Sequence, residues 1–263
     1  MHPRQKEGAM RETGFGIEGK VIVVTGADFG IGRGVALMLA EAGATVVPTV
    51  LDEANLADIR QDADAVGVVV HPVRLDVTDV AATRAVVEHI AKEHERIDVL
   101  FNNAGLGFGH PALAVTEADW DGMMAVNLRG LFFMSQAVAR VMFDQGGGRI
   151  INQSSQGGLV GLPEAAVYCA TKGGVNTLTK QLALEWARFG ITVNAIAPTF
   201  VETPGTRPIL DDPAKRADVL SKIPLGHVAA IDDVAAAVIY LASDAGRMLT
   251  GTILSVDGGW TAQ

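Results

Sequence analysis

The sequence predicts a single α/β domain, built on a doubly wound parallel sheet of about seven strands with helices on both faces. Short β-branched runs alternate with longer alanine- and leucine-rich stretches along the chain. The strand segments are apolar almost throughout, which is typical of a sheet buried on both faces. The length of 263 residues suits one large domain, and no repeat, linker or low-complexity stretch divides it.

The elements follow in order along the chain. β-branched or apolar runs predict strands at 21–25, 45–50, within 66–75, and at 97–103, 148–155, 191–198 and 252–256. Helical periodicity predicts helices at about 30–43, 80–95, 118–143, 163–189 and 231–243. Because strands and helices alternate, the strands lie parallel, and a ligand should bind at their carboxyl ends.

Composition excludes several classes of function. The net charge of -9 argues against nucleic acid or an anionic membrane surface as the partner. A phosphate-bearing cofactor remains open, because backbone N–H groups can hold phosphate. Cys169 is the single cysteine, so no intrachain disulfide forms. This is compatible with a cytoplasmic location. No second cysteine or local cluster of metal ligands accompanies Cys169, so we expect no metal site.

The chain has a polar N-terminal segment and no long apolar run. Residues 1–17 are polar and lack the apolar stretch of a signal peptide, so we expect a flexible tail followed by a catalytic domain at 18–263. No apolar run reaches the length of about 18 residues that a membrane span needs.

A glycine-rich turn joins the first strand to the first helix. TGADFGIG (25–32) places glycines at 26, 30 and 32, which allow a tight turn and close approach of the backbone to a ligand. The helix that begins there favours an anion at its N-terminus. The alternative is a plain strand-to-helix turn, but three glycines after a first strand favour a nucleotide. A P-loop is excluded, since no Gly-Lys-Ser/Thr follows.

Six short motifs occur along the chain, which are TGADFGIG, NNAG (102–105), VN (126–127), SS (154–155), YCATK (168–172) and VDGG (256–259). Together they resemble the short-chain dehydrogenases/reductases over about residues 18–260. Each alone is weak, but all six occur in the family's order and at the expected strand and helix ends. The resemblance implies a Rossmann-type fold and hydride transfer between a nicotinamide cofactor and an alcohol or carbonyl substrate.

The expected catalytic residues are Asn127, Ser155, Tyr168 and Lys172. Tyr168 and Lys172 stand four apart and share a helix face, so the ammonium should lower the phenol pKa. Tyr168 is the expected general acid/base. By resemblance, Ser155 holds the reacting oxygen, Lys172 also binds the nicotinamide ribose, and Asn127 keeps a water of a proton relay. Ser155 is preferred to Ser154 because of its spacing from Tyr168 and because neighbouring strand residues face opposite ways.

The expected cofactor contacts come from the glycine turn and the resemblance. They are Gly26, Asp28, Phe29, Gly30, Ile31, Gly32, Leu51, Asp52, Asp76, Val77, Asn103, Ala104, Gly105, Tyr168, Lys172, Pro198, Val201 and Thr203.

The choice between NAD and NADP follows neither pattern that is common in the family. Val50 stands where many NAD-using members have aspartate, and Phe29 where many NADP-using members have arginine. The ionisable side chains nearby in sequence are the acidic Asp28, Asp52 and Glu53. Asp52 lies 22 residues beyond Gly30, near the spacing of a ribose-binding acid. Because acids repel the extra phosphate of NADP, we expect NAD, with NADP as the alternative.

Three functions remain open. They are an NAD-dependent dehydrogenase or carbonyl reductase, an NADP-dependent reductase of 3-oxoacyl thioesters, and a non-catalytic dinucleotide-binding protein. The full catalytic set argues against the third. The resemblance also implies a homotetramer, with the helix at 163–189 in an interface. Residues 199 to about 226 contain four prolines and are expected to form a substrate lid.

Overall fold

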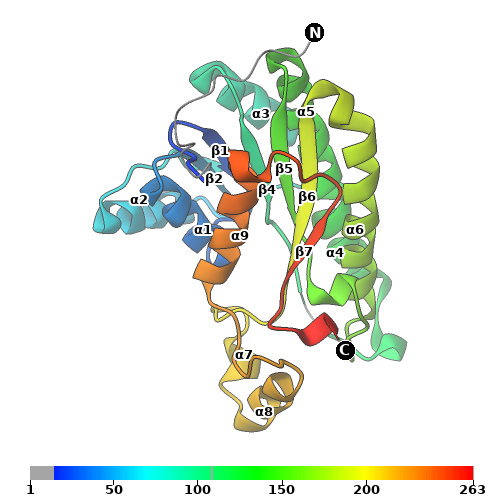
Figure 1. Cartoon of the computed structure of the whole chain (residues 1–263). Helices are drawn as coiled ribbons and strands as arrows, with labels where there is room; N and C mark the ends of the chain where they lie inside the picture. Colours follow the sequence, from blue (N-terminus) through cyan, green and yellow to red (C-terminus); the bar gives the residue numbers. More distant parts are fainter. Residues whose placement is uncertain (1–14, 108, 263) are drawn as a thin grey trace, which may run out of the picture.

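Seven parallel strands form one sheet in the order β3-β2-β1-β4-β5-β6-β7 (Figure 1). The computed structural model describes residues 15–107 and 109–262. The strands are β1 (Val21–Val24), β2 (Thr45–Val50), β3 (Val73–Arg74), β4 (Val99–Asn102), β5 (Gly148–Gln153), β6 (Ile191–Pro198) and β7 (Ile253–Val256). The predicted doubly wound α/β fold is therefore confirmed.

The helices form two layers and a small lobe. They are α1 (Gly30–Glu41), α2 (Asn55–Val66), α3 (Val80–His94), α4 (Glu117–Met124), α5 (Leu131–Gln145), α6 (Ala166–Trp186), α7 (Arg207–Leu210), α8 (Pro213–Ser221) and α9 (Ile231–Ala242). Buried side chains of α1, α2 and α9 pack on one face of the sheet, and those of α3, α5 and α6 on the other. None of the helices that the structure describes is long and apolar enough to cross a membrane.

Burial on both faces explains the continuous apolar runs of the strands. In β1, Ile22 and Val24 belong to the core under α1 and α9, whereas Val23 between them belongs to the core under α5. All three side chains are fully buried. Because neighbouring strand residues face opposite ways, a strand covered on both faces needs apolar residues at every position.

Three elements differ from the sequence prediction. The third strand is only two residues long, and Val70 bridges to Val46 separately from it. The helix α2 was not predicted, because Ile59 and Ala63 are its only fully buried residues and its apolar signal is weak. The helix predicted at 118–143 is interrupted by a π-helical turn at Ala125–Gly130, which separates α4 from α5.

The ordered domain begins before residue 18. Residues 1–14 of the predicted tail lie outside the described residues. Ile17 is 1% exposed and joins the core under α1, and the Phe15 ring lies 5.9 Å from the ring of Tyr240. Phe15 and Ile17 therefore pack against the domain, although both lie within the predicted tail of residues 1–17.

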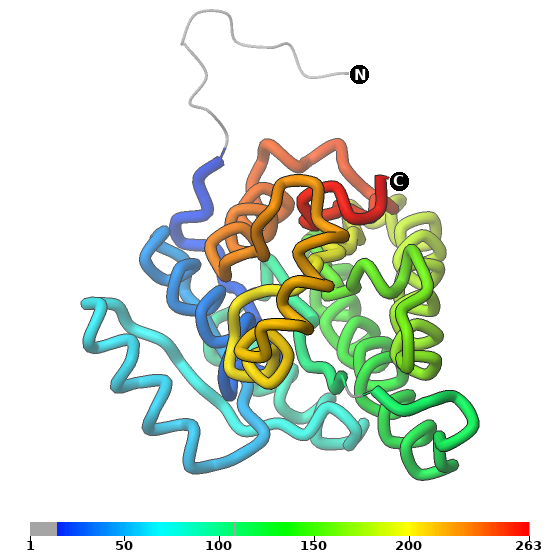
Figure 2. Tube along the Cα trace, turned by 90° about the horizontal axis from the view of Figure 1, so that it is seen from below, coloured from blue at the N-terminus to red at the C-terminus, as the bar shows by residue number. Residues whose placement is uncertain are grey.

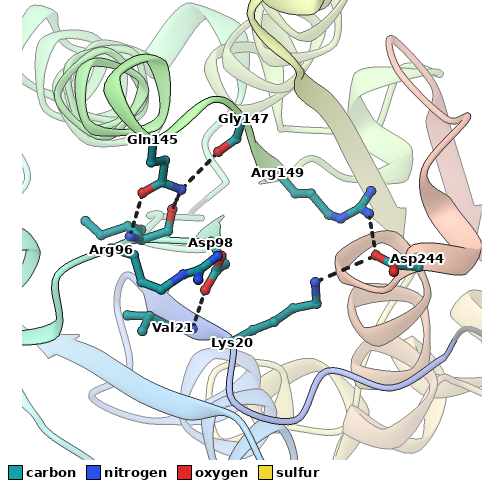
Figure 3. Close-up of polar contacts among 9 residues, drawn as sticks. Lys20, Val21, Arg96, Asp98, Gln145, Gly147, Arg149 and Asp244 are labelled. Carbon is teal, nitrogen blue, oxygen red and sulfur yellow. Dashed lines mark hydrogen bonds and ion pairs between the residues drawn. The ribbon is translucent and has the colours of Figure 1, made fainter. Parts of the chain in front are cut away.

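Polar contacts tie together the amino ends of β1, β4 and β5 (Figure 3). The Asp98 carboxylate accepts the backbone N–H of Val21 at 2.9 Å and pairs with Arg96. Asp244 pairs with Arg149 at 3.1 Å and with Lys20 at 3.8 Å. These contacts link neighbouring strands at the edge of the sheet opposite to the predicted ligand site.

The region after β6 forms a lobe beyond the carboxyl ends of the strands. It contains α7 and α8, which lie below the sheet in Figure 1 and across the middle of the face seen in Figure 2. Leu210, Val219, Ile223 and Val228 form a small core of its own. Within the predicted lid, Leu210 and Val219 lie in this core and Ile209 is exposed. The lobe thus has a small core of its own, and Trp260 near the C-terminus packs against it.

Candidate active site

A cleft of about 580 Å³ lies at the carboxyl edge of the sheet. It sits where the sheet order changes direction between β1 and β4, since β1 leads into the layer of α1 and β4 into the layer of α5. Such a switch point is where doubly wound folds bind ligands. Its walls are Gly26, Asp28, Phe29, Gly30, Ile31, Gly32, Leu51, Asp52, Asn55, Leu75, Asp76, Val77, Asn103, Ala104, Gly105, Leu106, Gly107, Val126, Gln153, Tyr168, Lys172 and Thr203.

The glycine turn fits tightly against the loop after β4. A Cβ on Gly26 would lie 2.6 Å from the Ala104 Cα, and one on Gly32 would lie 2.3 Å from the Gly26 carbonyl oxygen. Gly26 also has a φ of 68°, which disfavours other residues. The Asn103 amide donates to the carbonyls of Thr25 and Gly26 at 3.0 and 2.9 Å. The TGADFGIG and NNAG motifs therefore build one wall together.

The N-terminus of α1 faces this cleft with free N–H groups. Phe29 caps the helix without a side-chain hydrogen bond, and the first turn holds no acidic residue. By contrast, Asp79 caps α3 and Asp212 caps α8 with their carboxylates. The first N–H groups of α1, which have no partner within the helix, are therefore available to an anion such as a cofactor phosphate.

The end of β2 carries a carboxylate from the glycine turn. Both oxygens of Asp28 lie 3.0 Å from the backbone nitrogen of Leu51, and Oδ1 also accepts from the nitrogen of Asp52 at 3.1 Å. The Asn55 amide donates to the same Oδ1 at 2.9 Å. The structure adds one basic group that the sequence did not place here, because Arg74 donates Nε to the Leu51 carbonyl at 3.2 Å.

Tyr168 and Lys172 line another part of the cleft, and Ser155 lies next to Tyr168. Tyr168 and Lys172 lie one turn apart near the start of α6, and the Lys172 Nζ lies 5.7 Å from the centre of the Tyr168 ring. The Tyr168 side chain forms a hydrogen bond with that of Ser155. Lys172 donates to the Gln153 carbonyl at 2.8 Å. The chain thus places a phenol and an ammonium in the cleft wall, with the Ser155 hydroxyl beside the phenol.

The two neighbouring serines point to different surroundings. The Ser154 hydroxyl donates to the Asn176 Oδ1 at 2.6 Å and is buried against α6. The Ser155 hydroxyl contacts Tyr168 and accepts the N–H of Gly157 at 3.1 Å. The preference for Ser155, which came from strand alternation, agrees with these contacts.

Burial dominates the electrostatics of Tyr168 and Lys172. Burial raises the pKa of the Tyr168 phenol, and its hydrogen bond with Ser155 opposes this only in part. Burial also lowers the pKa of Lys172 to about 8. The expected lowering of the Tyr168 pKa is therefore wrong for the protein without cofactor, because burial disfavours the charged phenolate and raises the pKa.

Asn127 lies in the π-helical turn and is 1% exposed. Its Oδ1 accepts the N–H of Leu106 at 2.7 Å, and its amide donates to the Leu106 carbonyl at 2.9 Å and to the Thr171 hydroxyl at 3.1 Å. A Cβ on Gly105 would lie 3.4 Å from this Oδ1 and 3.6 Å from the Lys172 Nζ. Asn127 and Lys172 thus flank the same small space. π-Helical turns often occur at functional sites.

Sixteen of the expected cofactor residues line the cleft, and two do not. Pro198 ends β6 and pairs with Val256, and Val201 is 2% exposed and bridges to Ala229. The sequence prediction missed six lining residues, which are Asn55, Leu75, Leu106, Gly107, Val126 and Gln153. Strand alternation could have found Gln153, because it lies two residues before Ser155 and shares its face.

One further cluster could bind a metal ion. His71, Glu93 and His94 place their ligand atoms within 4.8 Å of one another, and none of them lines the cleft. The sequence prediction of no metal considered only clusters local to Cys169. His71 and Glu93 are 22 positions apart, so only the fold brings them together.

The chain is similar to known oxidoreductases over nearly its whole length. A family model described as enoyl-(acyl carrier protein) reductase matches residues 26–261. The 3-oxoacyl-(acyl-carrier-protein) reductase FabG of Thermotoga maritima is 41% identical, over 92% of this chain and 98% of the relative. The D-threitol dehydrogenase of Mycolicibacterium smegmatis is 41% identical, over 94% and 95%. The structure of a gluconate 5-dehydrogenase from Burkholderia cenocepacia with NADP and tartrate superposes with a TM-score of 0.91, at 37% identity over 95% and 98%.

Proposed function

This chain belongs to the short-chain dehydrogenase/reductase family, and we propose that Tyr168 is its general acid/base. The family membership makes it an oxidoreductase that transfers hydride with a nicotinamide cofactor. The observation that carries the proposal is that Tyr168 and Lys172 line the cleft close to each other, with Ser155 next to Tyr168. A protein that only bound the cofactor would not need a phenol placed in this way.

The residues of the cleft fit a dinucleotide. The uncapped N-terminus of α1 suits its phosphates. The Oε1 of Gln153, buried in the cleft wall, has no hydrogen-bond partner among the described residues, and a donor group of a ligand would satisfy it. We propose that Lys172, which lines the cleft, binds the ribose hydroxyls. When bound, the cofactor accepts or supplies the hydride.

Tyr168 moves the proton in either direction. In ketone reduction, its hydroxyl donates a proton to the carbonyl oxygen, and the raised pKa keeps it in this donor form. In alcohol oxidation, the phenolate must take the substrate hydroxyl proton. This form needs positive charge nearby, which Lys172 and the oxidised cofactor supply. Ser155 donates to the reacting oxygen and fixes its position.

Lys172 and Asn127 connect the site to solvent. Because both flank the space beside Gly105, a water bound there would accept a proton from Lys172 and pass it on. We propose that Asn127 holds this water, and that its two hydrogen bonds to Leu106 fix the amide for this role.

NAD is the proposed cofactor, and a secondary alcohol of a polyol or sugar acid is the proposed substrate. The carboxylate of Asp28 at the end of β2 supports NAD, although the solved relative from Burkholderia carries NADP. The substrate class is supported by the D-threitol and gluconate dehydrogenases among the similar proteins.

A second candidate is reduction of 3-oxoacyl thioesters. It is favoured by 41% identity with the FabG reductase of Thermotoga maritima. The two substrates differ in the group beside the reacting carbon. A thioester on a long carrier needs an open path to the cleft, whereas a polyol needs polar side chains around its hydroxyl groups.

Turnover with both classes of substrate tests the proposal. The nicotinamide absorbance is followed with NAD and NADP against a panel of polyols and sugar acids, and with the reduced cofactors against 3-oxoacyl thioesters. Oxidation of a polyol or sugar acid with NAD at the higher kcat/KM supports the first function. Faster reduction of a 3-oxoacyl thioester would replace it with the second.

We also propose a cytoplasmic homotetramer that uses α6 in an interface. Leu184, on α6, is 79% exposed, although most of the helix is covered. A large exposed aliphatic side chain beside the ring cluster of Phe143, Trp186 and Phe189 suits a contact with a second copy. The cytoplasmic location rests on the single cysteine.

A further inference from the structure

We infer that Asp28 determines the choice of cofactor in this protein, because its carboxylate occupies the backbone N–H groups that a 2′-phosphate would need. The inference rests on the proposed preference for NAD, and it names the residue that produces it. The end of β2 is where doubly wound folds hold the adenosine ribose. In this chain the last residue of β2 is the apolar Val50, so the acid must come from elsewhere.

The contacts of Asp28 distinguish a hydroxyl from a phosphate. Its Oδ1 accepts three hydrogen bonds, from the nitrogens of Leu51 and Asp52 and from the Asn55 amide. Its Oδ2 shares only the Leu51 nitrogen, at 3.0 Å. An ionised carboxylate oxygen can accept more than one hydrogen bond. A ribose hydroxyl can therefore donate to Oδ2. A phosphate dianion has no proton to donate and meets a like charge.

Asp52 does not share this role, although its spacing from the glycine turn first suggested it. Its own carboxylate accepts the N–H of Ala54 at 3.0 Å, in a local turn ahead of α2. Asp28 instead crosses from the turn after β1 to the backbone after β2, a separation of 23 residues to Leu51. Both side chains line the cleft, but Asp28 is the one that holds the N–H groups of the β2 end.

Arg74 and Asp28 have opposite effects on an incoming 2′-phosphate. Its Nε donates to the Leu51 carbonyl, so its guanidinium lies at the same end of β2 and attracts phosphate. With Asp28 in place, an incoming 2′-phosphate finds the N–H groups of Leu51 and Asp52 already bonded. Without Asp28, those two N–H groups and Arg74 form a set of donors that suits a phosphate.

Substitution of Asp28 tests the inference by cofactor binding, without any need for turnover. Dissociation constants are measured for NAD and NADP, and for the matched fragments AMP and 2′,5′-ADP, which differ only in the 2′-phosphate. The wild type should bind NAD and AMP more tightly. In Asp28→Ser, the affinity for NADP and 2′,5′-ADP should rise about tenfold or more, because hydrogen bonds to charged groups become available. The affinity for NAD should fall.

Three control variants separate the contributions. Asp28→Asn keeps an acceptor oxygen for the N–H groups and removes only the charge, so it should fold as the wild type does and shift the preference by a smaller factor. Asp52→Asn removes the same charge from the other side of this contact, after β2, and should change the ratio less than Asp28→Asn does. The double variant Asp28→Ser/Arg74→Gln should lose most of the gained NADP affinity.

The outcomes separate the inference from the proposed function. Failure of the wild type to bind any of the four ligands would overturn the proposed cofactor site. Binding with the same NAD-to-NADP ratio in the wild type and both Asp28 variants would overturn the role of Asp28 alone. An equal shift in Asp52→Asn would mean that net charge, and not the position of Asp28, sets the ratio.

Discussion

Replacing Lys172 by methionine should stabilise the protein near neutral pH and lose this effect as the pH rises. Lys172 is 4% exposed, and its Nζ donates to the backbone carbonyl of Gln153. Burial lowers the pKa of its ammonium from 10.5 to about 8. Methionine fills similar space without a charge, so it avoids the desolvation cost that lysine pays while protonated.

The size of the effect follows from the pKa. A fall from 10.5 to about 8 corresponds to about 3 kcal/mol, since one pKa unit is worth about 1.4 kcal/mol. Between these two values the unfolded chain binds more protons than the folded one, so the stability of the lysine form rises with pH. Between about pH 7 and pH 10 it should gain about 2.5 kcal/mol over the methionine form.

Urea unfolding at several pH values measures this difference. Both proteins carry Tyr168→Phe, because the phenol has a raised pKa and would titrate near the top of the range. The methionine form lacks the hydrogen bond to Gln153 at every pH. The quantity that tests the prediction is therefore the change with pH in the stability difference between the two forms. Lys180→Met is the control, because Lys180 is exposed on the same helix. A stability difference that stayed constant from pH 7 to pH 10 would refute a buried, destabilised ammonium.

Three further predictions concern the rest of the site and the assembly. Ser155→Ala should lower turnover with little change in stability. Ser154→Ala should retain turnover and lose about 1 kcal/mol of stability, because it breaks the hydrogen bond to Asn176. Steady-state kinetics and urea unfolding measure both effects, and a loss of turnover in Ser154→Ala but not in Ser155→Ala would contradict the assignment. Light scattering should give the mass of a tetramer. A monomer at micromolar concentration would refute the proposed interface at α6. Hydrogen exchange in 199–226 should slow with cofactor and a substrate analogue, and equal protection in both states would mean a fixed wall.

The sequence predicted most of the sheet because burial on both faces leaves a strong signal. Runs such as VIVVT at 21–25 are apolar at every position since both neighbouring layers need it. The helix α2 escaped prediction for the opposite reason, because it buries only Ile59 and Ala63 fully. The short β3 and the π-helical turn depend on tertiary contacts, which local periodicity does not report.

The placement of the proposed catalytic residues could be predicted because each belongs to a local motif with fixed spacing. Helical periodicity alone places Lys172 beside Tyr168, and strand alternation separates Ser155 from Ser154. The direction of the Tyr168 pKa could not be predicted in this way. It depends on how much water the folded cleft removes from the phenol, and that is set by side chains far apart in sequence.

The acidic side chain at the end of β2 also could not be predicted from local sequence patterns. Spacing indicated Asp52, but the carboxylate bonded to the β2 backbone belongs to Asp28. The contact spans two strands that pair in parallel, so it exists only after the sheet forms. Arg74 reaches the same place from β3, and no local pattern links it to the glycine turn.

Turnover and cofactor binding of Tyr168→Phe test the central claim most directly. Phenylalanine keeps the ring and loses the proton that Tyr168 exchanges. The variant should therefore bind NAD about as tightly as the wild type, while turnover falls by about 10²–10⁴-fold, the usual worth of general acid/base catalysis. Binding is measured by titration and turnover by nicotinamide absorbance with the best substrate of the panel. If the variant bound NAD normally and kept more than about a tenth of the wild-type turnover, Tyr168 would not be the general acid/base.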